Sequence, residues 1–181
     1  TSIEKNAFLN CKNLSEIIIP NSVTSIGDNA FTGCDNLNIL HASSKISSII
    51  AKQSNNIKEL YITSGNYIES FAFYSCQTIT NVILSNSIVK IQNNAFERCS
   101  NLTCIVIPDS VTDIGESVFE DCINLNYISL SKNISEIKNS TVYRCSKLTA
   151  LEIPDKVVSL GDGAFYGCSQ LINIQIPNKI V

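Results

Sequence analysis

Apolar and polar positions follow one another along this chain in a pattern that returns every 23 residues. Repetition with a period of roughly 20 to 50 residues is typical of solenoids, in which each repeat forms one coil and buries its apolar face against its neighbours. The repeated unit is AFxxCxxLxxIxIPxSVxxIGxx, and we expect about eight stacked coils. Seven residues mark the unit and are called the ladder cysteines here: Cys11, Cys34, Cys76, Cys99, Cys122, Cys145 and Cys168.

Each unit predicts a short strand, a corner and a second extended segment. Residues six and eight positions after the cysteine are apolar, as at Ile105 and Ile107, which predicts a strand of four to five residues with these side chains inward. A second extended segment is expected at Ser22–Ile26, followed by one turn of helix over Gly27–Cys34. Prolines, which fit a corner better than a strand interior, follow the first strand in four units: Pro20, Pro108, Pro154 and Pro177.

The third unit departs from this pattern. It is 20 residues long, and Ser54 stands at its ladder position. Aligning Ser43–Ile49 with Pro20–Ile26 gives this coil a second extended segment and leaves its turn without a phenylalanine. In a later unit Val142 replaces the phenylalanine, which predicts a locally repacked turn. We interpret both departures as drift of the repeat.

The ladder cysteines are predicted to be buried free thiols. Free cysteine is among the residue types most often buried. Parallel stacked coils give neighbouring cysteines the wrong torsion for a disulfide, and a straight row cannot surround a zinc ion with four ligands. The eighth cysteine, Cys104, lies in phase with the outward positions of its strand, as either an accessible thiol or a tolerated surface substitution.

The unit resembles the BspA-type class of leucine-rich repeats over essentially all 181 residues. The resemblance implies a β/α solenoid, a right-handed superhelix with a parallel β-sheet on its concave face. It also implies a cell-surface or secreted protein of bacteria or parasitic protists, with adhesion to host matrix proteins as its activity. In commoner leucine-rich repeats an Asn or Cys follows the strand, whereas the cysteine here precedes it, so that polar role is not carried over.

The chain is expected to be a single solenoid over residues 1–181. Thr1 and Val181 both fall in the middle of a unit, and neither end has an atypical capping repeat. We therefore expect a fragment of a longer array. Its uncapped apolar faces and open strand edges predict end-to-end self-association.

Composition and charge argue against several classes of function. Thirteen basic and sixteen acidic residues give a net charge of −3 with no basic stripe, which disfavours nucleic acid as a partner. No apolar run approaches the roughly 18 residues of a membrane helix, so no membrane insertion is expected. The single histidine, His41, is expected to be an exposed ring on a strand, and no nucleophile has a spacing that guarantees contact with it. We therefore expect no enzyme, cofactor or metal.

The outward positions of the strands predict a binding surface. Residues five and seven positions after the ladder position are apolar or aromatic in the middle of the predicted sheet, over about 20 Å at the usual strand spacing. Such a composition is typical of interface hot spots, although β-branched residues also stabilise a sheet through cross-strand pairs. We call these seven residues the sheet patch: Ile39, His41, Tyr61, Ile83, Cys104, Val106 and Tyr127.

Two functions fit these observations. The first is a non-enzymatic protein–protein interaction module, part of a cell-surface adhesin that binds host or extracellular matrix proteins such as fibronectin through the concave face. The alternative is an intracellular, cytoplasmic scaffold of the same fold that binds a cytosolic protein, which the free thiols favour.

Overall fold

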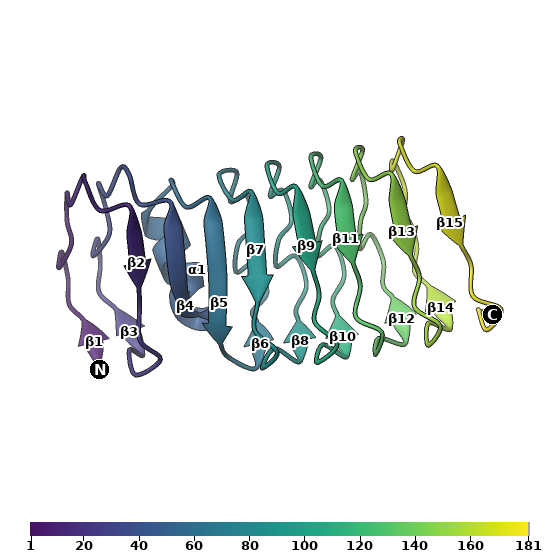
Figure 1. Ribbon diagram of the computed structural model, residues 1–181, viewed down its shortest axis with the longest axis horizontal. Helices are drawn as coiled ribbons and strands as arrows, with labels where there is room; N and C mark the ends of the chain where they lie inside the picture. Colours follow the sequence, from purple (N-terminus) through teal and green to yellow (C-terminus); the bar gives the residue numbers. More distant parts are fainter. Residues whose placement is uncertain (181) are drawn as a thin grey trace.

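Each repeat forms one coil, and the coils stack along a single axis from the N-terminus to the C-terminus (Figure 1). The structure is a computed structural model that describes residues 1–180. One face carries a six-stranded parallel sheet, the large sheet, in the spatial order β11-β9-β7-β5-β4-β2. Its strands are β2 (Glu16–Ile18), β4 (Ile39–Ser43), β5 (Glu59–Ser64), β7 (Asn81–Leu84), β9 (Cys104–Val106) and β11 (Tyr127–Ser129). A parallel pair continues the stack: β13 (Ala150–Glu152) and β15 (Asn173–Gln175).

A second row of two-residue strands lies on another side of the stack. These strands also pair in parallel with the equivalent strand of the next coil, as in Ile3 with Ile26 and Ile91 with Ile114. The row is interrupted twice within residues 1–180: after its second strand, because the third coil contributes no strand to it, and after its fifth strand, which does not pair with the sixth. Its members are β1 (Ser2–Ile3), β3 (Ser25–Ile26), β6 (Tyr67–Ile68), β8 (Lys90–Ile91), β10 (Asp113–Ile114), β12 (Glu136–Ile137) and β14 (Ser159–Leu160).

The third coil contains a helix, α1 (Ser44–Gln53), where the sequence alignment predicted a second extended segment. That prediction was wrong. The alignment gave Ile49 the inward position, but Ile46 and Ile50 are the fully buried isoleucines, and a spacing of four places them on one helix face. In Figure 1 the helix runs behind β4 and β5, on the side away from the viewer.

The turn after each second strand is not helical, contrary to the prediction of a helical turn. Residues in it enter the left-handed region at intervals, for example Asn29 at φ 55° and Gly33 at φ 74°. The intervening N–H groups can therefore point along the stack, and the Phe8 N–H donates to the carbonyl of Ala30 in the next coil at 2.8 Å. A continuous helix would direct its N–H groups along its own axis and could not bridge the coils in this way.

The inward columns predicted from the repeat form the core. Leu40, Leu60 and Ile105 are buried, as the alternation within the strands predicts. A row of phenylalanine rings fills the turn side, with Phe96 stacked between its neighbours at centroid distances of 5.1 and 5.7 Å. Val142 occupies the equivalent buried position in its coil and keeps the bond to the next coil, so the turn keeps its backbone link without a phenylalanine and the local repacking stays a prediction.

All eight cysteines are free thiols. Of the ladder cysteines, Cys34, Cys99, Cys122 and Cys145 are buried, as predicted, and Cys76 and Cys168 are partly buried. The prediction was wrong for Cys11, which is exposed. A buried ladder thiol donates to a carbonyl of the preceding coil, as Cys99 does to Phe73 at 3.1 Å, whereas the Cys11 thiol has no such bond within residues 1–180.

Candidate functional site on the large sheet

The large sheet brings the seven residues of the sheet patch onto one exposed face. Its register aligns His41 with Tyr61 and Tyr61 with Ile83 in one outward row. A parallel row aligns Cys104 with Tyr127. The patch therefore runs continuously from β4 to β11, as the repeat phase predicts.

One end of the patch is a small ordered network of aromatic and charged side chains. The rings of His41 and Tyr61 stack at a centroid distance of 4.2 Å and an interplanar angle of 8°. His41 Nε2 lies 3.1 Å from Glu16 Oε1, and the Tyr61 hydroxyl donates to Glu59 Oε2 at 3.0 Å. That hydrogen bond, above all, raises the pKa of Tyr61. His41 is thus partly covered by its partners, where the sequence predicted an exposed ring.

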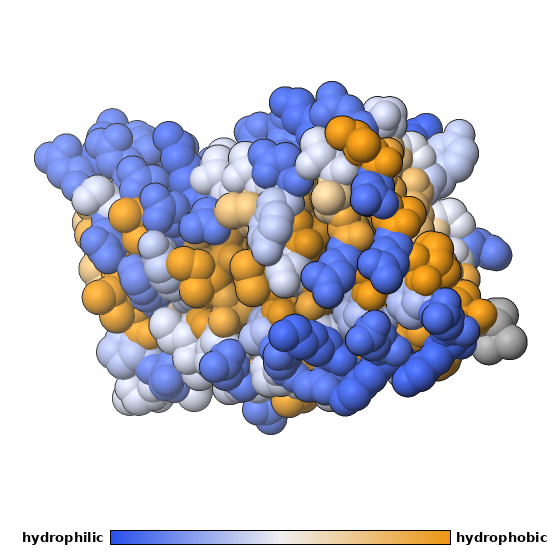
Figure 2. Space-filling view, turned by 45° about the vertical axis from the view of Figure 1, so that its right-hand side comes forward, coloured by the Kyte–Doolittle hydropathy of each residue, from blue (hydrophilic) through white to orange (hydrophobic). Residues whose placement is uncertain are grey.

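The other end of the patch is apolar and open to solvent. Ile83, Val106 and Tyr127 are 46%, 57% and 53% exposed, although all three are large hydrophobic residues. They border a groove of about 510 Å³ that runs across β7, β9 and β11. Figure 2 shows hydrophobic side chains gathered in a band across the middle of the visible surface, bordered by hydrophilic ones. A groove of this kind can exclude water from an inserted apolar side chain.

Cys104 lines the floor of this groove. Its side chain is partly exposed, as its outward phase predicts. The sulfur lies 3.7 Å from Oδ1 of Asn81 on the neighbouring strand. Cys104 is therefore part of the apolar groove and stands apart from the buried ladder thiols.

The described residues show neither a cluster of metal-binding side chains nor a membrane-spanning helix. Within residues 1–180, no three His, Cys, Asp or Glu side chains come together in a way that could hold a metal ion. In the same part of the chain, no helix has the length and apolar character needed to cross a membrane.

One feature of the surface was not predicted from the sequence. A second cavity, of about 460 Å³, lies between the end of α1 and the turn of the following coil. Its residues include Lys52, Asn55 and Tyr74. The sequence signal was present in the shortened third unit and in Ser54, but the alignment treated both as drift.

Comparison with known protein families identifies the repeat. A family model described as BspA type leucine rich repeat region matches in six copies, over residues 1–113 and 89–181. No curated protein matches the chain.

Solved structures with the same architecture come from several bacteria. A leucine-rich repeat protein from T. pallidum is 27% identical, with a TM-score of 0.62 over 96% of this chain and 72% of that one. A leucine-rich repeat protein from Bacteroides ovatus is 28% identical, with a TM-score of 0.64 over 99% of this chain and 42% of that one. One from Eubacterium ventriosum shares the fold at 16% identity, with a TM-score of 0.62 over 98% of this chain and 70% of that one.

Proposed function

The chain belongs to the BspA-type leucine-rich repeat family, and from this premise we propose that it binds another protein through the sheet patch. Leucine-rich repeats of this family are typical of protein-interaction modules and surface antigens. The observation that carries the proposal is the apolar groove, in which Ile83, Val106 and Tyr127 remain exposed around a partly exposed Cys104.

The composition of the groove supports a protein segment as its occupant. Tyrosine is enriched at interface hot spots, and a rim of polar groups improves the exclusion of water from them. The stacked pair His41 and Tyr61 extends the apolar groove with rings already held by Glu16 and Glu59. Groups that are ordered before binding lose less conformational entropy when a partner docks.

The biological setting proposed is the cell surface, with an adhesin as the parent protein and a matrix protein such as fibronectin as its partner. Membership of the BspA-type family supports this setting. The eight free thiols favour the second candidate, an intracellular scaffold that binds a cytosolic protein, because secreted proteins commonly oxidise exposed cysteines to disulfides. In both cases the chain acts without catalysis.

The proposal is tested by binding of the purified chain to immobilised matrix proteins, fibronectin first. Val106→Ser and Tyr127→Ala remove apolar side chains from the groove without touching the core. We expect saturable binding by the unmodified chain and a loss of at least about tenfold in affinity for each variant, the usual size of a hot-spot effect.

Ile18→Ser is the matched control. Ile18 is 68% exposed and occupies the same outward row on β2, beyond the patch. Its substitution removes similar apolar area from the same sheet, so binding should be unchanged. Equal losses in Ile18→Ser and Val106→Ser would contradict a localised site, and an absence of matrix binding would leave the scaffold as the better candidate. Circular dichroism verifies folding of each variant.

A further inference from the structure

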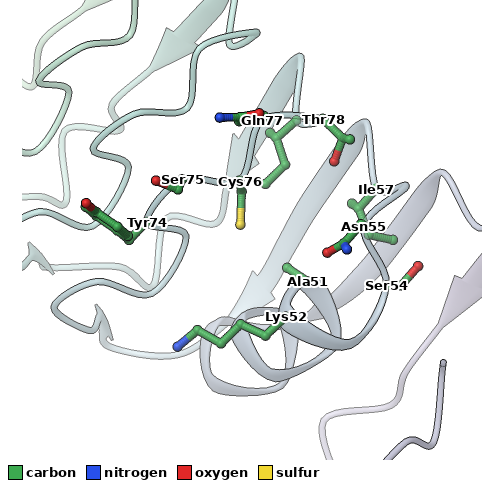
Figure 3. Close-up of a pocket in the computed structure, with 11 residues that line it drawn as sticks. Ala51, Lys52, Ser54, Asn55, Ile57, Tyr74, Ser75, Cys76, Gln77 and Thr78 are labelled. Atoms are coloured by element: carbon green, nitrogen blue, oxygen red, sulfur yellow. The ribbon is translucent and has the colours of Figure 1, made fainter.

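The cavity between α1 and the following coil lies away from the sheet patch, at a place where the repeat is broken. The end of α1 contributes Ala51 and Lys52, and the turn of the next coil contributes Tyr74 and Cys76. In Figure 3 the Cys76 sulfur and the Ala51 methyl group point toward each other across the space. Lys52 lies at the end nearer Tyr74, whereas Asn55 and Thr78 lie at the opposite end.

The cavity lies where α1 replaces the turn of a regular coil. In a regular coil that turn supplies the backbone carbonyl to which the next ladder thiol, here Cys76, would donate. Cys34, Cys99, Cys122, Cys145 and Cys168 all donate to a carbonyl of the preceding coil at 3.1–3.2 Å. Cys76 has no such bond among residues 1–180, because the preceding coil is helical there. The buried hydroxyl of Ser54, which also borders the cavity, has no hydrogen-bond partner either. The cavity is therefore bordered by two polar groups, the Cys76 thiol and the Ser54 hydroxyl, that have no hydrogen-bond partner within residues 1–180.

The lining combines neutral polar groups with an apolar floor. Amides and hydroxyls are supplied by Asn55, Gln77 and Thr78, and these groups can both donate and accept hydrogen bonds. Ile57 and Ile79 lie behind these groups and are almost wholly buried, whereas the methyl group of Ala51 faces the space. A ligand that carries many hydroxyl groups on an apolar ring matches such a mixture, because its hydroxyls also donate and accept.

Two further side chains define what such a ligand would carry. Lys52 is the only charged residue that lines the cavity, no carboxylate lines it, and Lys52 forms no ion pair within residues 1–180. Tyr74 is held in place by Arg98, whose Nη1 donates to the tyrosine hydroxyl at 2.7 Å, and by the ring of Phe71 at 5.8 Å. The cavity therefore presents one cation and one fixed aromatic ring.

We propose that this cavity binds a sugar that carries a carboxylate, with Lys52 as its counter-charge and the Tyr74 ring against the sugar. The volume of about 460 Å³ falls in the usual range of small-molecule sites and accommodates one or two sugar rings. The ammonium of Lys52 donates a charge-assisted hydrogen bond, which is stronger than a bond between neutral groups. This site is separate from the protein-binding groove of the large sheet.

The test uses the full chain and three probes, measured by ligand-observed NMR titration: glucuronate, glucose and acetate. We expect saturable binding of glucuronate, at least about tenfold weaker binding of glucose, and no saturable binding of acetate. Lys52→Gln should bring glucuronate down to the level of glucose. Tyr74→Ala should weaken both sugars.

Lys45→Gln is the matched control, because Lys45 lies on the same helix, is exposed and lines no part of this cavity. Its affinity for glucuronate should be unchanged, as should that of Val106→Ser in the sheet patch. The proposal is overturned if no sugar binds, if glucose binds as well as glucuronate, if acetate binds equally, or if Lys45→Gln and Lys52→Gln lose affinity alike. Loss of protein binding in Val106→Ser with glucuronate binding retained would separate the two sites.

Discussion

Five of the seven ladder cysteines act as hydrogen-bond donors as well as apolar side chains. Cys122 and Cys145 are fully buried, and each donates to a phenylalanine carbonyl of the coil before it, at 3.1 and 3.2 Å. Each of these carbonyls also accepts from a backbone N–H of its own coil, as Phe96 does from Cys99 at 3.1 Å, so the thiol supplies a second hydrogen bond that links two neighbouring coils. Ser54 shows the alternative, because its hydroxyl is buried in the third coil without any partner.

Thiol reactivity should separate the cysteines into classes. In the folded protein at pH 8, Cys11 should react first with Ellman's reagent and Cys104 more slowly, because one is exposed and the other partly covered. Burial raises the pKa of Cys99, Cys122 and Cys145 well above the ordinary thiol value, so these should react only after unfolding, when all eight titrate. Cys11→Ala should remove the fast phase. Fast reaction of a fully buried ladder thiol would contradict this assignment.

The side chain of Gln53, the last residue of α1, forms hydrogen bonds to the second coil in the place where a backbone peptide group forms them in regular coils. In regular coils the phenylalanine N–H donates to a carbonyl of the next coil, as Phe73 does to Ala95 at 2.8 Å. In the third coil the Gln53 Oε1 accepts from the Phe31 N–H at 3.2 Å, and its Nε2 donates to the Gly27 carbonyl at 3.0 Å. One side-chain amide thus pairs the Phe31 N–H, which α1 would otherwise leave without a partner, and adds a second hydrogen bond to the Gly27 carbonyl, which also accepts from the Ala30 N–H at 3.3 Å.

Gln53→Ala should lower the free energy of unfolding by about 2 kcal/mol, because it leaves the Phe31 N–H without a partner and removes one of the two hydrogen bonds to the Gly27 carbonyl. Urea denaturation followed by circular dichroism measures the change. Gln170→Ala is the control, since Gln170 is exposed and forms no side-chain hydrogen bond in the described part of the chain. The role of Gln53 is refuted if the two variants have equal stability.

The sequence predicts most of this fold because neighbouring coils repeat one another. The inward positions of Leu40 and Ile105 follow from alternation alone, and the patch residues follow from the same phase. The helix was missed because the alignment imposed the pattern of the other coils on Ser44–Gln53, although Ile46 and Ile50 have helical spacing. The cavity depends on that helix, so it was missed together with the helix when the shortened third unit was interpreted as drift of the repeat.

Stability should depend on pH on the alkaline side. Burial raises the pKa of Cys76 to about 11 and raises the pKa values of Cys99, Cys122 and Cys145 well above the ordinary thiol value, so the folded chain holds protons that the unfolded chain releases. This contribution is fully present below the pKa of the unfolded thiol, about 8.5, and is lost as pH rises toward the folded values. Each buried thiol steepens the decline by about 1.4 kcal/mol per pH unit.

Urea titrations between pH 7 and pH 10 measure this decline. Cys122→Ala should start from a lower stability, because it leaves a gap in the core, but should lose stability less steeply with pH than the unmodified chain. Ionisation of lysine and tyrosine side chains is common to both proteins and cancels in the comparison. Identical slopes would show that the buried thiol does not contribute.

The interruption of the second row of strands at α1 should allow the first two coils to unfold separately from the middle coils. A solenoid is stabilised by the interfaces between neighbouring coils, so a weaker interface limits how far cooperative unfolding spreads. The second row of strands stops at β3 and resumes at β6, so no strand pairing of that row joins the first two coils to the rest within residues 1–180. Hydrogen bonds between these parts come from the β2–β4 ladder, from Gln53, and from Thr63 and Ser64, which donate to Asn21 Oδ1. Local opening of the first two coils should therefore need less free energy than opening of the middle coils.

Native-state hydrogen exchange tests this division. Amides in residues 1–37 should exchange faster than those in residues 79–145, where Phe96 and Phe119 form an unbroken stack. Fraying at the chain end would also accelerate hydrogen exchange in the first coil. The decisive comparison is therefore between variants. Gln53→Ala should accelerate exchange in residues 1–37 and leave the middle coils unchanged, whereas Gln170→Ala should not alter residues 1–37. Acceleration throughout the chain in Gln53→Ala would mean that the coils unfold as one cooperative unit, with the helix as an ordinary part of it.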